Sequence, residues 1–397
     1  MNMRRALVLA VVVALAAAPA LASGFGFYEQ GAKASAQSGA WVARADDASA
    51  NWYNPAALVH LNGREVQFGF NYVQSGNDTH FTPAATPGTT FDAVANGVAP
   101  FHFYFSQKIN DRVAWGIGLN NPFGLVTEWA DPTMTFYALR SELRTYLLNP
   151  NVAFKLGNYW SFGMGVDYIA VQVNEFSQQP GPGVTIDTTG EGDAWGYNFA
   201  LQFKMKSVSI AAQYRSELRN EIFGSVGFIT PLGSTSVPAT AFVDLPGQTM
   251  LGVAWTGERV DVEVGAYYTQ WNYFKSLDIS APPLPTITLP QYWEGSWSYR
   301  LGLAFRLGAE MEHELRVGGV LDETPIPAEF LRPSIPDADR IGYSLGYGYQ
   351  GKKWGVDIYA MYFDFDDATA IGGALGVIDG TYKTTILLAG VTAKYRF

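Results

Sequence analysis

Residues 195–205, WGYNFALQFKM, alternate between two kinds of side chain. One face carries the large apolar residues Trp195, Tyr197, Phe199, Leu201, Phe203 and Met205. The other face carries the small or polar residues Gly196, Asn198, Ala200, Gln202 and Lys204. A period of two residues is typical of a β-strand, and this run is longer than the usual strand of roughly 5–6 residues. The segment predicts a long strand whose two faces meet different environments.

Three other segments repeat the pattern, at residues 65–72 (EVQFGFNY), 161–168 (SFGMGVDY) and 297–306 (WSYRLGLAFR). Their polar faces include Glu, Asp and Arg, which cannot be packed into a dry core without partners. A soluble β-sandwich would also alternate, but with shorter strands and its apolar faces turned inward. The reverse arrangement fits better, with apolar residues facing lipid and polar residues lining a lumen. Backbone groups in lipid must be paired internally, so the sheet is expected to close.

The connections between these strands alternate between short and long. Short polar turns lie near residues 110–111, 157–158, 206–207, 257–258, 308–312 and 351–352. Long segments lie near residues 74–98, 122–145, 176–193, 217–245, 272–294, 323–337 and 365–380. Six turns and seven long segments join fourteen strands, an even number as in bacterial outer-membrane barrels. We therefore predict an all-β fold, a 14-stranded antiparallel transmembrane β-barrel over residues 63–397.

The two ends of the chain indicate export to the outer membrane of a Gram-negative bacterium. Residues 1–22 contain Arg4, Arg5 and an alanine-rich apolar run, and they end in an A-x-A cleavage pattern typical of a signal peptide. A membrane anchor is the alternative, but the run is short and ends at Pro19. The last strand ends at Phe397, which is like the C-terminal signal that the barrel-assembly machinery recognises.

Composition and motifs argue against several other classes of protein. The net charge of −10 disfavours nucleic-acid binding, and the absence of cysteine excludes disulfides. The four histidines are scattered without ligand spacing, so we expect no metal and no cofactor. The G-x-S-x-G match at residues 342–346 and the G-x-G-x-x-G match at 346–351 lie in an alternating strand without a following helix. Both matches therefore fail as catalytic or nucleotide-binding motifs, and we expect no enzyme.

Residues 23–62 have neither the two-residue period nor a long helical stripe, and they are rich in Gly, Ala and Ser. If the first strand begins near Glu65, this segment lies on the side of the short turns. It is long enough to fill the lumen, so we predict an N-terminal hatch, or plug, over residues 23–62.

The N-terminal segment and several barrel motifs resemble the FadL family of outer-membrane transporters. The matching elements are Phe25 and Phe27, Asp46-Asp47-Ala48, Asn54-Pro55-Ala56, NPFGLVTEW at 121–129 and IPDADR at 335–340. The resemblance implies a fourteen-stranded barrel with a plug, acting as a monomer. It also implies passive transport of long-chain fatty acids or other hydrophobic compounds past the lipopolysaccharide layer into the lipid of the outer membrane.

The resemblance also assigns roles to residues. Extracellular loops capture the ligand, an apolar pocket receives it, and a gap at the kinked third strand releases it sideways. The expected capture residues are Phe123, Leu125, Trp129, Met134, Phe136 and Leu139, and the expected pocket residues are Phe25, Phe27 and Tyr28. The expected gate comprises Asp46, Asp47, Asn54, Pro55 and Ala56, and the expected strand kink comprises Gly116 and Gly118.

Recognition of a carboxylate head group is the point at which this sequence departs from the family pattern. Fatty-acid members hold the head group with basic side chains, and the matching positions here are Gln172 and Ser296. Arg300 or Arg215 are the candidate substitutes. Two alternatives remain open: uptake of neutral aromatic hydrocarbons by the same route, and a general porin, which would lack a plug.

Overall fold

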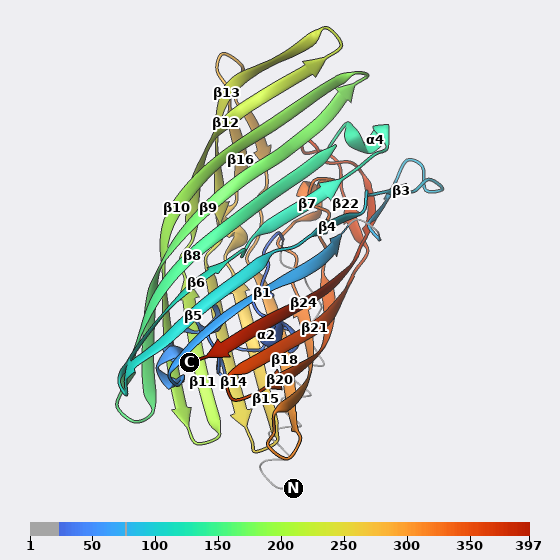
Figure 1. Ribbon diagram of the computed structural model, residues 1–397. Helices are drawn as coiled ribbons and strands as arrows, with labels where there is room; N and C mark the ends of the chain where they lie inside the picture. The colour runs from blue at the N-terminus through green and yellow to red at the C-terminus, as the bar shows by residue number, and fades with distance from the viewer. Residues whose placement is uncertain (1–23, 76–77) are drawn as a thin grey trace.

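The computed structural model describes residues 24–75 and 78–397 and confirms the closed fourteen-stranded antiparallel barrel (Figure 1). The strands that close the ring are β1 (Arg64–Ser75), β5 (Phe101–Asn110), β6 (Val113–Asn120), β8 (Arg140–Leu156), β9 (Trp160–Gly181), β10 (Val184–Met205), β11 (Val208–Arg215), β14 (Gln248–Thr256), β15 (Val260–Thr269), β18 (Ser296–Leu307), β19 (His313–Asp322), β20 (Arg340–Gln350), β21 (Trp354–Phe365) and β24 (Thr385–Arg396). The last strand pairs with the first, with Glu65 opposite Arg396. The predicted signal peptide lies outside the described residues.

The environment of the two strand faces is also as predicted. On β10, the outward Trp195 has 69% of its surface exposed, whereas the inward Asn198 is fully buried. Large apolar side chains therefore cover the outside of the barrel and polar ones its inside, the arrangement of an outer-membrane barrel. Among the described residues, no helix has the length and apolar character needed to cross a membrane.

Two of the predicted loops, residues 176–193 and 217–245, consist mostly of strand. β12 (Leu218–Thr230) continues the line of β11, because β10 pairs with β11 through its C-terminal half and with β12 through its N-terminal half. β13 (Gly233–Leu245) pairs with β12 and leads into β14. Residues 176–193 likewise belong to β9 and β10, and these two strands extend together with β12 and β13 beyond the rest of the barrel (Figure 1). The apolar alternation stops at Trp195, so the period alone did not reveal them.

Shorter elements lie mainly at the end of the barrel with the long connections. They are β2 (His80–Pro83), β3 (Phe91–Asp92), β4 (Asn96–Val98), β7 (Gly124–Glu128), α4 (Pro132–Thr135), η2 (Trp271–Tyr273), β16 (Ser276–Ser280), β17 (Ile287–Pro290), η3 (Ala328–Phe330), β22 (Ala368–Ala370) and β23 (Gly380–Lys383). Four of them, β22, β23, β2 and β3, form a separate small sheet.

Residues 24–62, here called the N-terminal segment, contain α2 (Ala32–Ser35), α3 (Ala50–Tyr53) and η1 (Pro55–His60). Nearly all of their side chains are buried, including Trp41 and Leu58. The segment contacts inward-facing side chains from strands around the barrel. Glu263 of β15 accepts hydrogen bonds from the backbone N–H groups of Ala43 (2.7 Å) and Arg44 (3.0 Å). Thr392 of β24 accepts one from Ala32 (2.9 Å).

Candidate ligand cavity

The third strand of the barrel is interrupted at residues 121–123. β6 ends at Asn120, which lies opposite Leu147 of β8, and β7 begins at Gly124, which lies opposite Arg144. Residues 121–123 of this strand therefore lie opposite only residues 145 and 146 of β8, so the strand bulges. Pro122 also supplies no backbone donor for pairing between the strands. The Asn121 side chain instead accepts a hydrogen bond from the backbone N–H of Phe101 on β5 (2.9 Å).

The start of the N-terminal segment pairs with this interruption. Gly26 lies opposite Phe123 in an antiparallel bridge. The Phe27 N–H donates to the Pro122 carbonyl (2.8 Å), and the Gly124 N–H donates to the Phe25 carbonyl (3.0 Å). Residues 25–27 therefore satisfy backbone groups that the neighbouring barrel strand leaves unpaired.

The turn Asn54-Pro55-Ala56, part of the expected gate, does not lie beside residues 121–123. It packs against Gly163 of β9, where an added Cβ would lie 2.5 Å from the Pro55 carbonyl carbon. Within the segment, the Asn54 side chain donates to the Val42 carbonyl (2.7 Å) and accepts from the Ala56 N–H (3.1 Å). The rigid turn thus fits the N-terminal segment to the wall at β9.

Gly116 and Gly118 also differ from their expected role as a kink. Both pair in regular register with β5 and β8. A Cβ at Gly116 would lie 2.6 Å from the Asn51 side-chain nitrogen and 2.7 Å from the Phe105 carbonyl oxygen. These glycines therefore make room for α3, and the strand breaks further along, at Pro122.

Asp46 and Asp47 hold the N-terminal segment in place. Asp46 forms an ion pair with Lys33 of the same segment (2.7 Å). Asp47 accepts a hydrogen bond from the Ser49 N–H (3.1 Å) and lies 3.8 Å from the Nζ atom of Lys394 on β24. Neither carboxylate lies at the interruption.

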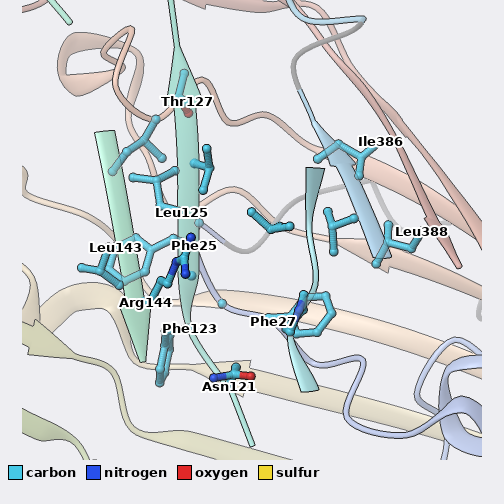
Figure 2. Close-up of a pocket in the computed structure, with 18 of the residues that line it drawn as sticks. Phe25, Phe27, Asn121, Phe123, Leu125, Thr127, Leu143, Arg144, Ile386 and Leu388 are labelled. Carbon is cyan, nitrogen blue, oxygen red and sulfur yellow. The ribbon is translucent and has the colours of Figure 1, made fainter. Parts of the chain in front are cut away.

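A cavity of ≈ 450 Å³ lies beside the interruption. Its apolar lining comes from the N-terminal segment and from strands on both sides, and includes Phe25, Phe27, Val73, Phe101, Phe123, Leu125, Leu143, Phe363, Phe365, Ile386 and Leu388. Figure 2 shows Leu143 and Leu125 on one side of the cavity and Ile386 and Leu388 on the other. Two of the three predicted pocket residues thus line it. The third, Tyr28, is buried elsewhere and is hydrogen-bonded to the Thr269 side chain.

Of the six predicted capture residues, two line the cavity and four lie elsewhere in the segment between β6 and β8. Phe123 and Leu125 line the cavity. Trp129 is buried and donates a hydrogen bond to the Pro333 carbonyl (2.9 Å), and Met134 is also buried. Leu139 is half-buried away from the cavity lining. Phe136 is 49% exposed, so among these six residues it presents the most apolar surface to a ligand in solution.

Charged groups gather at the inner end of the cavity. Arg340 lies over the ring of Phe363 (4.5 Å) and forms an ion pair with Asp322 (2.8 Å). Asp337 accepts hydrogen bonds from the Gly24 N–H (3.0 Å) and the Thr324 hydroxyl (2.8 Å), and burial raises its pKa to about 6. Burial also raises the pKa of Glu29, another lining residue. Burial thus favours the neutral form of these two carboxyl groups.

The two arginines expected to bind a head group are engaged with the protein. Arg300 is fully buried, lies 3.7 Å from Glu29 Oε1, and donates to the Ser38 carbonyl (2.8 Å). Arg215 is paired with Asp167. Neither lines the cavity.

The arginines that do line the cavity were missed from the sequence. They are Arg144 and Arg340. Each carries a recognisable signal: Arg340 ends the IPDADR motif, and Arg144 stands where the apolar outward face of β8 ends.

A closed barrel with an apolar outside and an apolar internal cavity defines an outer-membrane barrel suited to hydrophobic ligands. Residues 13–397 match the sequence profile described as "Outer membrane protein transport protein (OMPP1/FadL/TodX)", and the chain belongs to this family.

Similar proteins share this architecture over most of their length. The long-chain fatty acid transport protein of Escherichia coli K12 is 27% identical over 436 residues, covering 94% of both chains. The crystal structure of a Pseudomonas aeruginosa FadL homologue matches with a TM-score of 0.84 at 19% identity, covering 94% of this chain and 100% of the other. The Pseudomonas putida toluene transporter TodX matches with a TM-score of 0.71 at 15% identity, covering 94% and 99%. This protein is therefore a FadL-type outer-membrane transporter of hydrophobic compounds.

Proposed function

We propose that this protein transports long-chain fatty acids, which are captured at the extracellular loops, enter the cavity and leave sideways through the interrupted third strand. The N-terminal segment acts in this proposal as the hatch that blocks the straight path through the lumen. No energy source is required, because the ligand moves down its concentration gradient.

The observation that carries the proposal is that one cavity is lined from both faces of the barrel wall. Successive side chains of a strand point to opposite faces. On β8, the inward Leu143 and Thr145 and the outward Arg144 and Tyr146 all line the cavity. Such a lining is expected where the neighbouring strand leaves a gap, and the interruption at residues 121–123 supplies one. A sideways route therefore needs no opening of a continuous hydrogen-bonded wall.

The size and chemistry of the cavity support a fatty acid as the ligand. Its volume of ≈ 450 Å³ falls in the range of about 300–1,000 Å³ that is usual for small-molecule sites. Its apolar lining suits an acyl chain, and the arginines Arg144 and Arg340 supply positive charge for a carboxylate. The relative from E. coli K12 carries the name of a long-chain fatty acid transport protein.

The second candidate is uptake of neutral aromatic hydrocarbons by the same route. It is favoured by the phenylalanines of the lining, which are Phe25, Phe27, Phe101, Phe123, Phe363 and Phe365. Aromatic rings pack well against each other in edge-to-face or offset geometry. The fold is also shared with TodX, which is described as a toluene transporter.

The test is uptake of a labelled long-chain fatty acid and a labelled aromatic hydrocarbon, by cells that lack their own transporter and express this protein. We expect the fatty acid to enter. We expect Leu125→Asp, which places a charge in the apolar cavity, to reduce its uptake about tenfold or more, since burying an unpaired carboxylate costs several kcal/mol. The matched control is Leu232→Asp, at a fully exposed leucine between β12 and β13, and it should behave like the wild type.

The other outcomes separate the candidates. Entry of the hydrocarbon alone would replace the fatty-acid proposal with the second candidate. Entry of neither ligand would contradict both, and equal losses in the two variants would show that the cavity is not the route.

A further inference from the structure

The outward face of β8 changes character between Arg144 and Tyr146. From Tyr146 to the far end of the strand the outward residues are apolar, namely Tyr146, Leu148, Pro150, Val152, Phe154 and Leu156. Leu148 lies opposite Tyr168, whose ring is 4.8 Å from that of Trp195. Aromatic girdles of this kind mark the level of the lipid head groups. Arg144 lies two outward positions beyond Leu148, and therefore on the extracellular side of this girdle.

The same part of the wall forms the outer mouth of the cavity. Phe101 of β5 and Tyr146 of β8 both point outward and line the cavity, and their ring centroids are 6.4 Å apart. Where β6 runs between β5 and β8, these two strands are two strand spacings apart, about 10 Å. The two rings approach each other because the third strand is interrupted at this level. They close the mouth on its lipid side, and Arg144 borders it on the extracellular side.

Arg144 is the accessible cation of this mouth. Its side chain is 52% exposed, and it forms an ion pair with Glu142 Oε1 (2.7 Å). A guanidinium has five N–H donors in a planar fork, so this pair leaves further donors for a second carboxylate. The residue opposite on β7 is Gly124, where even an added Cβ would lie 3.8 Å from its nearest neighbour, the Leu143 carbonyl oxygen. The space beside the guanidinium is therefore open.

The other arginine of the lining is in a different position. Arg340 lies at the inner end of the cavity, with its side chain about one-tenth exposed, and is paired with Asp322. It can meet a ligand inside the barrel, whereas Arg144 can meet one at the boundary with the membrane.

We propose that Arg144 binds the carboxylate of a long-chain fatty acid at the lateral mouth and holds it at head-group level while the acyl chain passes between Phe101 and Tyr146 into the bilayer. This proposal rests on the fatty-acid function proposed above. A fatty acid in a membrane keeps its carboxylate at the interface, because a charge in hydrocarbon is costly. A cation at the mouth therefore spares the carboxylate from crossing the apolar layer, and it selects acids over neutral molecules with the same chain.

The test compares cellular uptake of labelled oleic acid and labelled oleyl alcohol, which differ only at the head group. We expect Arg144→Gln to reduce oleic acid uptake about threefold to tenfold, the range given by loss of a charge-assisted hydrogen bond partly screened by water. Oleyl alcohol uptake should change less than about twofold. Arg144→Lys, which keeps the charge, should retain at least about half of the oleic acid uptake. The control is Arg219→Gln, at an arginine 69% exposed on β12 and outside the cavity lining.

Each contrary outcome has a separate meaning. Unchanged oleic acid uptake in Arg144→Gln would refute the role of Arg144 while leaving transport intact. Equal losses of acid and alcohol would show that Arg144 only maintains the shape of the mouth. Failure of the wild type to take up oleic acid would refute the proposed function itself.

A lipopolysaccharide phosphate is the rival anion for Arg144. Binding of oleic acid to purified protein in a nonionic detergent without lipopolysaccharide distinguishes the two. We expect the acid-specific loss in Arg144→Gln to persist there. If the loss disappears without lipopolysaccharide and returns when it is added, Arg144 contacts the lipopolysaccharide and the proposal is wrong.

Discussion

At the scale of single residues, glycine decides how closely the N-terminal segment approaches the wall. Gly163 of β9 packs directly on the turn at Pro55 and Ala56, and any side chain at this position would collide with the backbone of that turn. We expect Gly163→Ala to destabilise the protein by about 1–3 kcal/mol, the usual cost of overpacking. Thermal unfolding in nonionic detergent should show this as a lower Tm.

The control for this prediction is Gly227→Ala on β12. A Cβ there would lie 3.6 Å from the Asp187 carbonyl oxygen, an ordinary contact. Its Tm should be that of the wild type. If the two variants unfold at the same temperature, the close packing of the Asn54-Pro55-Ala56 turn on β9 does not contribute to stability.

Single residues are also where the sequence was least informative. Arg300 and Arg144 are both polar residues in alternating strands, and only their surroundings separate them. Arg300 points inward and is surrounded by Glu29, Asp322 and the backbone of the N-terminal segment. Those partners lie far away in the sequence, so periodicity cannot identify them. Arg144 could have been found, because a charged residue on an outward face marks the end of the lipid-facing surface.

At the scale of elements, the strands in contact with lipid were predictable and the others were not. Lipid imposes a period of two on the outward face, so the fourteen barrel strands and their short turns could be counted from sequence. The upper parts of β9, β10, β12 and β13 lie beyond the girdle at Trp195, where no such pattern is imposed. They are held instead by backbone pairing, and their polar composition predicts loops where the structure has strands.

The N-terminal segment provides a second prediction at this scale, because the proposed sideways route does not require this segment to leave the barrel. The hydroxyl oxygens of Ser38 in this segment and Ser344 on β20 lie 2.9 Å apart. Cysteines at both positions are therefore close enough to form a disulfide in the oxidising environment of an exported protein. The chain has no other cysteine, so this would be its one disulfide.

We expect the double variant Ser38→Cys, Ser344→Cys to retain at least about half of the wild-type fatty-acid uptake when oxidised. The two single variants control for the substitutions, and a reducing agent controls for the cross-link. Loss of uptake that is restored by reduction would mean that the segment must move away from β20, and would favour passage straight through the lumen.

At the scale of the whole molecule, polar side chains on the inside of the barrel bind the N-terminal segment. Residues from β11, β15 and β24 all bind the N-terminal segment: Gln213 donates to the Trp52 carbonyl (3.0 Å), Glu263 accepts from Ala43 and Arg44, and Lys394 lies near Asp47. These contacts come from separate parts of the ring. The segment is thus tied to the wall at several points, which distinguishes this arrangement from an open porin.

Ion conductance in planar bilayers tests this difference. We expect the reconstituted wild type to carry no large steady current, because the N-terminal segment, as the proposed hatch, would occupy the lumen that an open barrel leaves to water. Glu263→Ala removes the acceptor of two backbone hydrogen bonds, at 2.7 and 3.0 Å, and should loosen the segment enough to give more frequent transient openings. Glu258→Ala, in the turn before β15, should conduct like the wild type. A large steady wild-type current would contradict the filled lumen and revive the general porin as the function of this barrel.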